Sequence, residues 1–203
     1  PVSNLLMGKG LIDAENPKDL GTFLSKYENI NAYDAIESSD CVISVGVINS
    51  DLNTYRGGMP LLPADYIDIR GTYTKVEHIK YESVLMQDML AALAATIQER
   101  DIAIPEKTPS FPKTEAPDDS KLCAEYIYPR IQEFLEPNDM VFVETGIIPH
   151  GFAPTRLPKN VEFNSQTLWG SIGWATGAVL GGQMAAQDRR AILITGEGSH
   201  QLT

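Results

Sequence analysis

Short apolar runs alternate with amphipathic stretches in the first half of the chain. Cys41 to Val47 and Tyr66 to Ile69 are rich in β-branched or aromatic residues and have the pattern of buried parallel strands. A strand at Val2 to Leu6 and a helix around Tyr33 to Ser38 are also predicted. Val84 to Gln98 predicts an amphipathic helix, whose apolar face carries Leu85, Met89, Leu90, Leu93 and Ile97.

The same alternation returns in the last part of the chain. A helix is predicted over Lys121 to Leu135, followed by a buried strand at Met140 to Glu144. A short strand at Val161 to Phe163, a helix rich in Gly and Ala at Ile172 to Gln187, and a strand at Ala191 to Thr195 complete it. Strands that alternate with helices predict an α/β fold with parallel sheets.

A change of composition separates these two parts. Residues 104–120 carry four prolines among Lys, Glu, Asp and Thr, which is typical of a semi-rigid, extended linker. We therefore predict two pieces of doubly wound, parallel-sheet domains joined by this Pro-rich linker: part of one domain at 1–103 and the start of a second, truncated one at 121–203. Both ends of the chain lie inside expected elements, so we expect an internal fragment of a longer protein.

Composition and charge restrict the partners. The 203 residues are 43% hydrophobic and 21% charged, as in ordinary soluble globular proteins. A net charge of −11 without a basic patch argues against a nucleic-acid partner. No apolar stretch is long enough to cross a membrane, and no signal peptide is recognisable, so we expect a cytoplasmic protein. Cys41 and Cys123 are expected as buried, reduced thiols.

The last strand leads into a turn with candidate chemistry, Gly196-Glu197-Gly198-Ser199. In an open parallel sheet, ligands bind where strands end and helices begin. Two glycines let backbone N–H groups approach a phosphate, and the helix start supplies partial positive charge. An acidic residue between them is well placed to bind a Mg²⁺ ion that bridges two phosphates. Taken alone, the turn is equally compatible with a plain strand-to-helix connection.

Two further segments lie at predicted strand or helix ends. Leu168-Trp169-Gly170-Ser171-Ile172-Gly173 precedes the Gly-rich helix, and Val143-Glu144-Thr145-Gly146 closes the strand before it. The Gly and Ala residues of the helix are explained by close packing on a sheet. Close packing does not explain an exposed loop with the sequence Trp-Gly-Ser-Ile immediately before the helix.

These motifs resemble the thiamine-diphosphate-dependent 2-oxo-acid decarboxylases, the family of pyruvate and indolepyruvate decarboxylases. Leu168 to Gly173 and Ile194 to Thr203 resemble that family's cofactor domain. Met7 to Gly10, Ser44 to Gly46 and Ser50 to Thr54 resemble its central domain. The resemblance implies a carboxy-lyase that converts a small 2-oxo acid to an aldehyde and CO₂ without oxidation. It also implies thiamine diphosphate and Mg²⁺ as cofactors and a homo-oligomer in the full-length enzyme.

The resemblance assigns roles to individual residues. The carbonyl of Gly170 would accept a hydrogen bond from the cofactor's aminopyrimidine, and Ile172 would be the wedge that keeps the cofactor bent. Thr145 would lie beside the aminopyrimidine and the substrate. Glu197 would be the metal ligand, and the catalytic set would be incomplete in this chain. Cofactor binding is assigned to Thr145, Gly170, Ser171, Ile172, Gly196, Gly198 and Ser199.

Departures from the family leave the substrate open. Glu197 stands where the family usually has Asp, and Ile147 where a small hydroxyl residue is frequent. Relatives often have a Phe that narrows the substrate pocket where this chain has Tyr55 to Gly58. We expect pyruvate, because Glu144-Thr145-Gly146 resembles the pyruvate-type members. Indolepyruvate or another bulky acid is the alternative, favoured by Gly57 and Gly58.

Two readings from other classes accompany this one. In isolation, the 203-residue chain is expected to be a catalytically inert structural piece. A nucleotide-binding α/β module would need a Gly-x-Gly-x-x-Gly turn after the first strand, and Met7 to Gly10 offers only a short imitation of it. The three histidines, His78, His150 and His200, have no partner at catalytic spacing and are predicted to be surface or loop residues.

Overall fold

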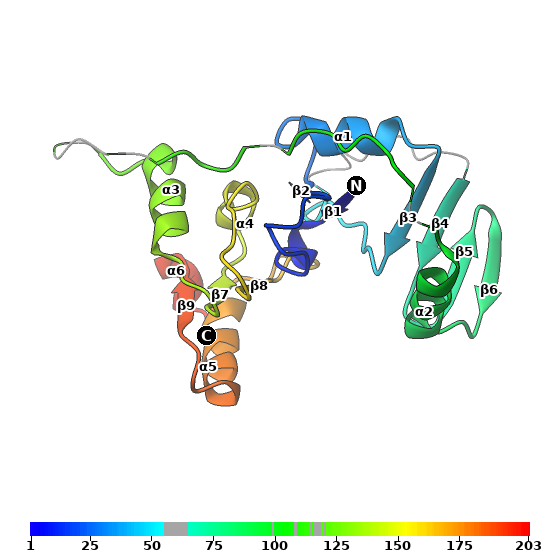
Figure 1. Cartoon of the computed structure of the whole chain (residues 1–203). Helices are drawn as coiled ribbons and strands as arrows, with labels where there is room; N and C mark the ends of the chain where they lie inside the picture. The colour runs from blue at the N-terminus through cyan, green and yellow to red at the C-terminus, as the bar shows by residue number, and fades with distance from the viewer. Residues whose placement is uncertain (55–64, 99, 108, 114, 116–118, 120) are drawn as a thin grey trace.

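A computed structural model describes residues 1–203 except 55–64, 99, 108, 114, 116–118 and 120. Within the described residues, the strands form three sheets of two, four and three strands. Figure 1 shows the two-stranded sheet lying between the other two. The predicted α/β fold with parallel sheets is confirmed.

The chain begins with a small parallel pair. β1 (Val2–Asn4) pairs with β2 (Asp19–Thr22), and the short 3-10 helix η1 (Leu6–Gly8) lies between them in sequence. α1 (Ile30–Glu37) follows and begins at Asn29, whose side chain accepts a hydrogen bond from the backbone N–H of Ala32 at 3.0 Å. An Asn at this position satisfies one of the free N–H groups of the first turn, which is why the helix begins there.

The four-stranded sheet is mixed. β3 (Cys41–Val45) and β4 (Asp65–Ile69) are parallel, as predicted, but β3 is largely exposed rather than buried. β5 (Tyr73–Val76) and β6 (Ile79–Glu82) extend the sheet as an antiparallel hairpin. The sequence analysis did not predict this hairpin. Its two-residue turn contains Glu77 at a φ of 54°, a left-handed conformation that two-residue hairpin turns require.

The predicted amphipathic helix is present as α2 (Met86–Thr96). None of its residues is buried. Leu85, Leu90 and Ile97 are 42%, 38% and 59% exposed. The helix assignment is therefore confirmed, and the apolar face of the helix is exposed in this chain.

The C-terminal sheet is parallel, with the order β8-β7-β9. β7 (Met140–Val143) is buried throughout and lies between the other two strands. α5 (Trp174–Ala185) packs against β7 and β9 (Ala191–Ile194), and its Gly182 allows close contact, since a Cβ there would lie 2.4 Å from the Phe142 ring. The remaining elements of this part are α3 (Ala124–Phe134), α4 (Ile148–Gly151), β8 (Glu162–Ser165) and α6 (Glu197–His200).

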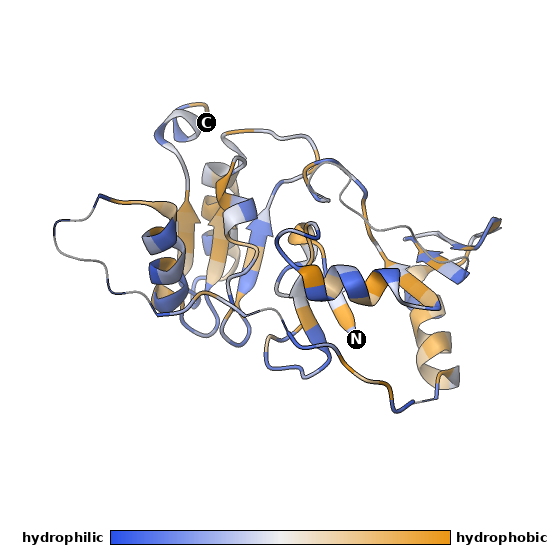
Figure 2. Ribbon diagram, turned by 90° about the horizontal axis from the view of Figure 1, so that it is seen from above, coloured by the Kyte–Doolittle hydropathy of each residue, from blue (hydrophilic) through white to orange (hydrophobic). Residues whose placement is uncertain are grey.

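One apolar core joins the start of the chain to this sheet. Leu6 and Leu24 are fully buried in the same cluster as Val141, Val143 and Phe152. Figure 2 shows the apolar strands of the C-terminal sheet enclosed by flanking helices. Residues near the N-terminus thus pack on elements that lie more than a hundred positions away in the sequence. Strands as apolar as β7 need cover on both faces of the sheet, and these residues contribute to it.

The predicted linker contacts both parts. Among the described residues of 100–123 there is no helix or strand. Lys107 Nζ donates to Asp19 Oδ2 at 2.5 Å, and the Phe111 ring stacks on Tyr128 at 5.9 Å between centroids. The domain boundaries at 103 and 121 stay predictions.

The expectation of two buried thiols is wrong, because Cys41 is exposed at the start of β3 and Cys123 is only partly covered.

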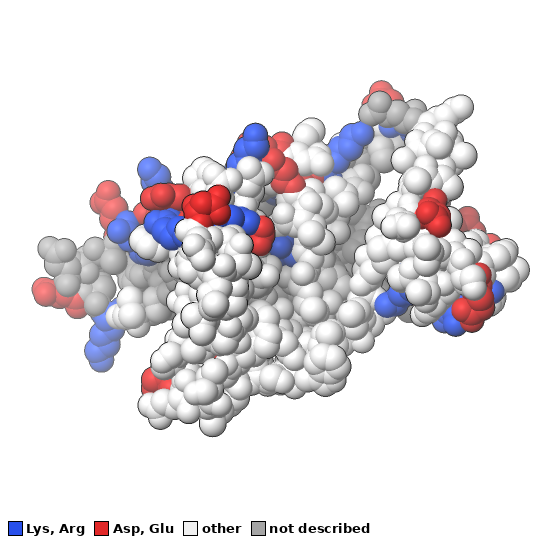
Figure 3. Space-filling model, turned by 90° about the horizontal axis from the view of Figure 1, so that it is seen from below, with Lys and Arg blue, Asp and Glu red and all other residues white. Residues whose placement is uncertain are grey.

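α5 carries no charged residue, and the side of the molecule that includes it is largely free of Lys, Arg, Asp and Glu in Figure 3. No helix in the described part of the chain has the length and apolar character needed to span a membrane.

Candidate functional site

The register of the C-terminal sheet brings three strand ends to one edge. Val143 is paired with Ser165 on one side and with Ile194 on the other, and all three strands run parallel. The loops that follow therefore begin side by side at the carboxyl edge. These loops carry Thr145, the segment 170–172 and the segment 196–199, which are the site residues predicted from the sequence.

Thr145 connects the first two loops. Its Oγ1 donates a hydrogen bond to the carbonyl oxygen of Gln166 at 2.9 Å. Gly170 adopts a φ of 63°, and a Cβ at Gly170 would lie 4.0 Å from Thr145 Cγ2. The two residues therefore face each other across the loop after β8, and the backbone conformation at Gly170 is one that favours glycine.

The residues around Gly170 project outward. Trp169 is 81% exposed and Ile172 is 51% exposed, although both are large apolar side chains. Ser171 between them is exposed as well. An exposed apolar loop at the carboxyl edge of a parallel sheet is a surface suited to cover a ligand.

The third loop is joined to the second through Gly173. Gly173 has a φ of 93°, and its carbonyl oxygen accepts a hydrogen bond from Thr203 Oγ1. Thr176 Oγ1 and His200 Nδ1 are 3.0 Å apart, which places α6 next to the start of α5. Hence Gly196, Glu197, Gly198 and Ser199 lie on the same edge as Gly170, on the β9 side of the central strand β7.

The two glycines of the last turn are not required by the fold. A Cβ at Gly196 or Gly198 would meet nothing within 4 Å, and neither residue has a left-handed φ. Gly173 differs, since a Cβ there would lie 3.0 Å from Thr203 Oγ1. Open space above Gly196 and Gly198 fits a group that approaches the backbone closely, as a diphosphate does.

The described residues of this turn could supply only part of the ligands that a metal ion needs. Glu197 is exposed in this turn, and the described residues contain no cluster of three or more His, Cys, Asp or Glu that could hold a metal ion. Mg²⁺ binds near-octahedrally to oxygen atoms and usually keeps several waters. Glu197 is thus suited to supply one oxygen, with phosphate oxygens and water among the others.

A loop of the first part of the chain also reaches this edge, and its contacts there were not predicted from the sequence. Ser50 Oγ donates to the carbonyl oxygen of Thr167 at 2.9 Å, and Leu52 Cδ1 lies 3.4 Å from where a Cβ of Gly170 would be. His150 Nε2 is 3.0 Å from the carbonyl oxygen of Leu52, and its Nδ1 is 3.1 Å from that of Gly146. No local signal could have found these contacts, since Leu52 and His150 are 98 positions apart.

The departures noted in the sequence have different outcomes. Ile147, at the N-terminal boundary of α4, is 83% exposed beside the Thr145 loop. Tyr55 to Gly58, where a pocket-narrowing residue was sought, lie outside the described residues. Among the described residues of the first part, Leu52 lies against Gly170.

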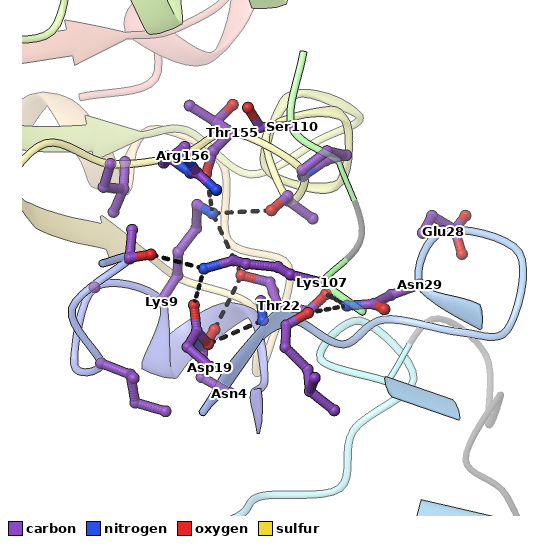
Figure 4. A pocket seen from close by; sticks show the side chains of 18 of the residues that line it. Asn4, Lys9, Asp19, Thr22, Glu28, Asn29, Lys107, Ser110, Thr155 and Arg156 are labelled. Carbon is purple, nitrogen blue, oxygen red and sulfur yellow. Dashed lines mark hydrogen bonds and ion pairs between the residues drawn. The ribbon is translucent and has the colours of Figure 1, made fainter. Parts of the chain in front are cut away.

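A cavity of about 60 Å³ lies elsewhere, between the two-stranded sheet, the loop 153–157 and the residues Lys107, Pro109 and Ser110. Lys9 is its central residue and donates to the carbonyl oxygens of Ala153 at 2.8 Å and Thr155 at 2.7 Å (Figure 4). Burial lowers the pKa of Lys9 to about 7, against the attraction of Asp19. None of the predicted site residues lines this cavity, so it belongs to the junction between the two parts.

Comparisons with known proteins agree with the motifs. Residues 1–96 match the family described as the central domain of thiamine pyrophosphate enzymes. The chain is 32% identical to a pyruvate decarboxylase of Candida albicans over 217 residues, which cover 100% of this chain and 37% of that protein. It is 36% identical over 204 residues to the pyruvate decarboxylase of Kluyveromyces lactis, covering 97% of this chain and 36% of that protein.

A solved structure shares the fold. Benzoylformate decarboxylase from Polynucleobacter necessarius has a TM-score of 0.62 to this chain at 15% sequence identity, covering 99% of this chain and 39% of its own. The present chain spans 36% to 37% of the length of the two relatives named above.

Proposed function

Because this chain belongs to the thiamine-diphosphate-dependent 2-oxo-acid decarboxylases, we propose that the protein containing it converts pyruvate to an aldehyde and CO₂ without oxidation, using thiamine diphosphate and Mg²⁺. One observation carries the proposal: Thr145, the segment 170–172 and the segment 196–199 lie at one edge of one parallel sheet. Thr145 is more than twenty positions from the other two segments, and the fold brings all three to one edge of the sheet, the edge where ligands bind in open parallel sheets.

The proposed roles are those that the family resemblance implies, and the positions of the residues are compatible with them. Bound thiamine diphosphate supplies the electron sink for the carbon–carbon bond that breaks. The Gly170 carbonyl would accept a hydrogen bond from the aminopyrimidine, and Thr145 would border the same ring. Ile172 is half exposed in the present chain, so its side chain is accessible to pack under a bound ring system.

The last turn would hold the charged end of the cofactor. Gly196 and Gly198 leave their backbone open to a diphosphate, and the hydroxyl of Ser199 is available to donate to it. Glu197 would bind Mg²⁺ through one carboxylate oxygen. Its extra methylene relative to Asp would let the carboxylate reach farther from the backbone, which the exposed position of Glu197 permits.

We propose pyruvate as the substrate because Glu144-Thr145-Gly146 resembles the pyruvate-type members. Thr145 and Leu52 both lie close to Gly170 and would border the substrate there. Indolepyruvate or another bulky 2-oxo acid is the alternative within the same reaction. The cytoplasmic location and the homo-oligomeric state stay predictions.

The test is a turnover assay on the full-length gene product. Aldehyde formation from pyruvate, indolepyruvate and benzoylformate would be followed with and without added thiamine diphosphate and Mg²⁺. We expect turnover of pyruvate that disappears when a chelator and gel filtration remove both cofactors and returns when they are restored. Faster turnover of indolepyruvate than of pyruvate would show that pyruvate is the wrong substrate. Turnover that does not need the cofactors, or no turnover of any 2-oxo acid, would contradict the proposed reaction.

A further inference from the structure

A buried carboxylate lies directly beneath the candidate site. Glu144 follows the last residue of β7 and is 1% exposed. Its Oε1 accepts a hydrogen bond from the backbone N–H of Thr145 at 2.8 Å. Its Oε2 accepts from the backbone N–H groups of Gly173 at 3.1 Å and Ala175 at 3.2 Å. Within the described residues, the side chain of Glu144 thus accepts its hydrogen bonds from backbone amides.

This arrangement explains how a charged group is tolerated there. A buried carboxylate is costly unless it is paired or fully hydrogen-bonded. Gly173 and Ala175 belong to the first turn of α5, whose N–H groups have no partners within the helix and carry partial positive charge. The carboxylate of Glu144 therefore occupies the start of α5 and holds it against the end of β7.

The same hydrogen bonds fix two site segments relative to each other. Thr145 is the neighbour of Glu144 in the first loop, and Ile172 precedes Gly173 in the second. The carbonyl oxygen of Gly173 also accepts from Thr203 Oγ1, and a Cβ at Gly173 would lie 3.3 Å from the Ser199 carbonyl oxygen. One side chain is thereby linked to all three loops of the candidate site.

We propose that Glu144 is a positioning residue for the reaction: its two carboxylate oxygens set the distance between the Thr145 loop and the segment Gly170 to Ile172. The role rests on the proposed function, because that segment is the one expected to hold the cofactor in its reactive conformation. A Gln at this position has one acceptor oxygen, and its NH₂ group would face backbone N–H donors. An Asp keeps the charge, but it is one methylene shorter.

Asp139 offers a matched control. It is also a buried acidic residue in the same sheet, 2% exposed, but it precedes β7 and therefore lies at the opposite edge. Its carboxylate pairs with Arg190, at 2.7 Å from Nη2 to Oδ2. Asp139→Asn should lower stability without touching the candidate site, so it separates a general loss of stability from a loss of positioning.

The experiment uses the full-length gene product as Glu144→Gln, Glu144→Asp and Asp139→Asn. We expect Glu144→Gln to lower kcat by at least about thirtyfold while KM changes by less than about threefold, since the loop is needed for the reactive geometry. In the cofactor-free protein, amide hydrogen exchange of peptides covering residues 170–176 should accelerate at least about tenfold, with the strands β7 and β9 unchanged. Asp139→Asn should keep kcat within about twofold.

The exchange measurement separates the two proposals. If the wild-type protein decarboxylates nothing, the proposed function fails, and exchange at 170–176 still decides whether Glu144 holds that segment. Unchanged exchange there, or faster exchange spread over the whole sheet as in Asp139→Asn, would overturn the positioning role. If Glu144→Gln yields no folded protein, Glu144→Asp gives the decision, and a kcat within about twofold of wild type would overturn the role.

Discussion

Ser50 Oγ donates a hydrogen bond to the carbonyl oxygen of Thr167 at 2.9 Å, although the two residues are 117 positions apart. Ser50 belongs to the part of the chain that matches the central domain of thiamine pyrophosphate enzymes, whereas Thr167 belongs to the loop that carries Gly170. Ser50 Oγ also accepts from the backbone N–H of Asn53 at 3.0 Å. The central part therefore supports the candidate site directly.

Replacing Ser50 tests that support. Ser50→Ala removes both hydrogen bonds, and we expect the free energy of unfolding of the chain to fall by about 1 to 2 kcal/mol. Denaturant unfolding followed by circular dichroism measures the change. Ser38→Ala is the control, because Ser38 is exposed at the end of α1 and bonds only locally, to the carbonyl oxygen of Asp34. Equal effects of the two substitutions would show that the Ser50 contact adds nothing.

Lys9 predicts a pH dependence of stability. Burial lowers its pKa from 10.5 in the unfolded chain to about 7 in the folded one. Between these values the unfolded chain binds more protons, so stability should rise with pH. The difference in unfolding free energy between wild type and Lys9→Met should move in favour of wild type by up to about 1.4 kcal/mol per pH unit above pH 7. A difference that stays flat from pH 7 to pH 10 would contradict this.

Asp139 predicts a second pH dependence of stability, at acid pH. Its hydrogen bonds with the Arg190 guanidinium hold the pKa of this carboxyl below its usual value of 3.8. A lowered pKa contributes stability that is fully present above pH 3.8 and is lost as pH falls through the folded value. Asp139→Asn should therefore cost about 2 kcal/mol at pH 7, and the difference from wild type should shrink towards pH 2. Unfolding curves at the two pH values measure it.

Ile172 tests the wedge assignment. In the full-length gene product, Ile172→Ala should lower kcat far more than it weakens cofactor binding, because the side chain is expected to hold a conformation rather than to add affinity. Leu180→Ala, which removes an apolar side chain that is 64% exposed on α5, is the comparison and should leave kcat unchanged. Loss of cofactor affinity with normal turnover at saturating cofactor would show that Ile172 is not a wedge.

The sequence predicted those parts of the fold that have a local pattern. β3, β4, β7 and β9 are short apolar runs, and α3 and α5 have helical patterning or composition. The β5–β6 hairpin was missed although Tyr73 to Glu82 has high strand propensity, since its charged and polar residues hid the alternation. The exposure of α2 could not be predicted either, because its apolar pattern gives no partner.

The candidate site was predictable to the same degree. Thr145, Gly170 and Gly196 were assigned to the site from the family resemblance. Each also follows a predicted strand or precedes a predicted helix, so parallel strands that end at one edge were expected to bring them together. For Ser50, Leu52 and Glu144, no role in the site was predicted from the sequence. The first two reach the site through tertiary packing alone. Glu144 acts through backbone amides of a helix start, which no sequence spacing reveals.

The most direct test of the account is a cofactor titration with two glycine variants. A Cβ meets nothing within 4 Å at either Gly198 or Gly177, so the fold should accept both Gly198→Ala and Gly177→Ala. Gly198 lies in the turn expected to hold the diphosphate, whereas Gly177 lies within α5. Calorimetric titration of the full-length gene product with thiamine diphosphate in the presence of Mg²⁺ should show Kd raised at least about tenfold by Gly198→Ala, at an unchanged Tm, and left alone by Gly177→Ala. Equal cofactor affinity of wild type and Gly198→Ala would contradict the assignment of the carboxyl edge as the cofactor site.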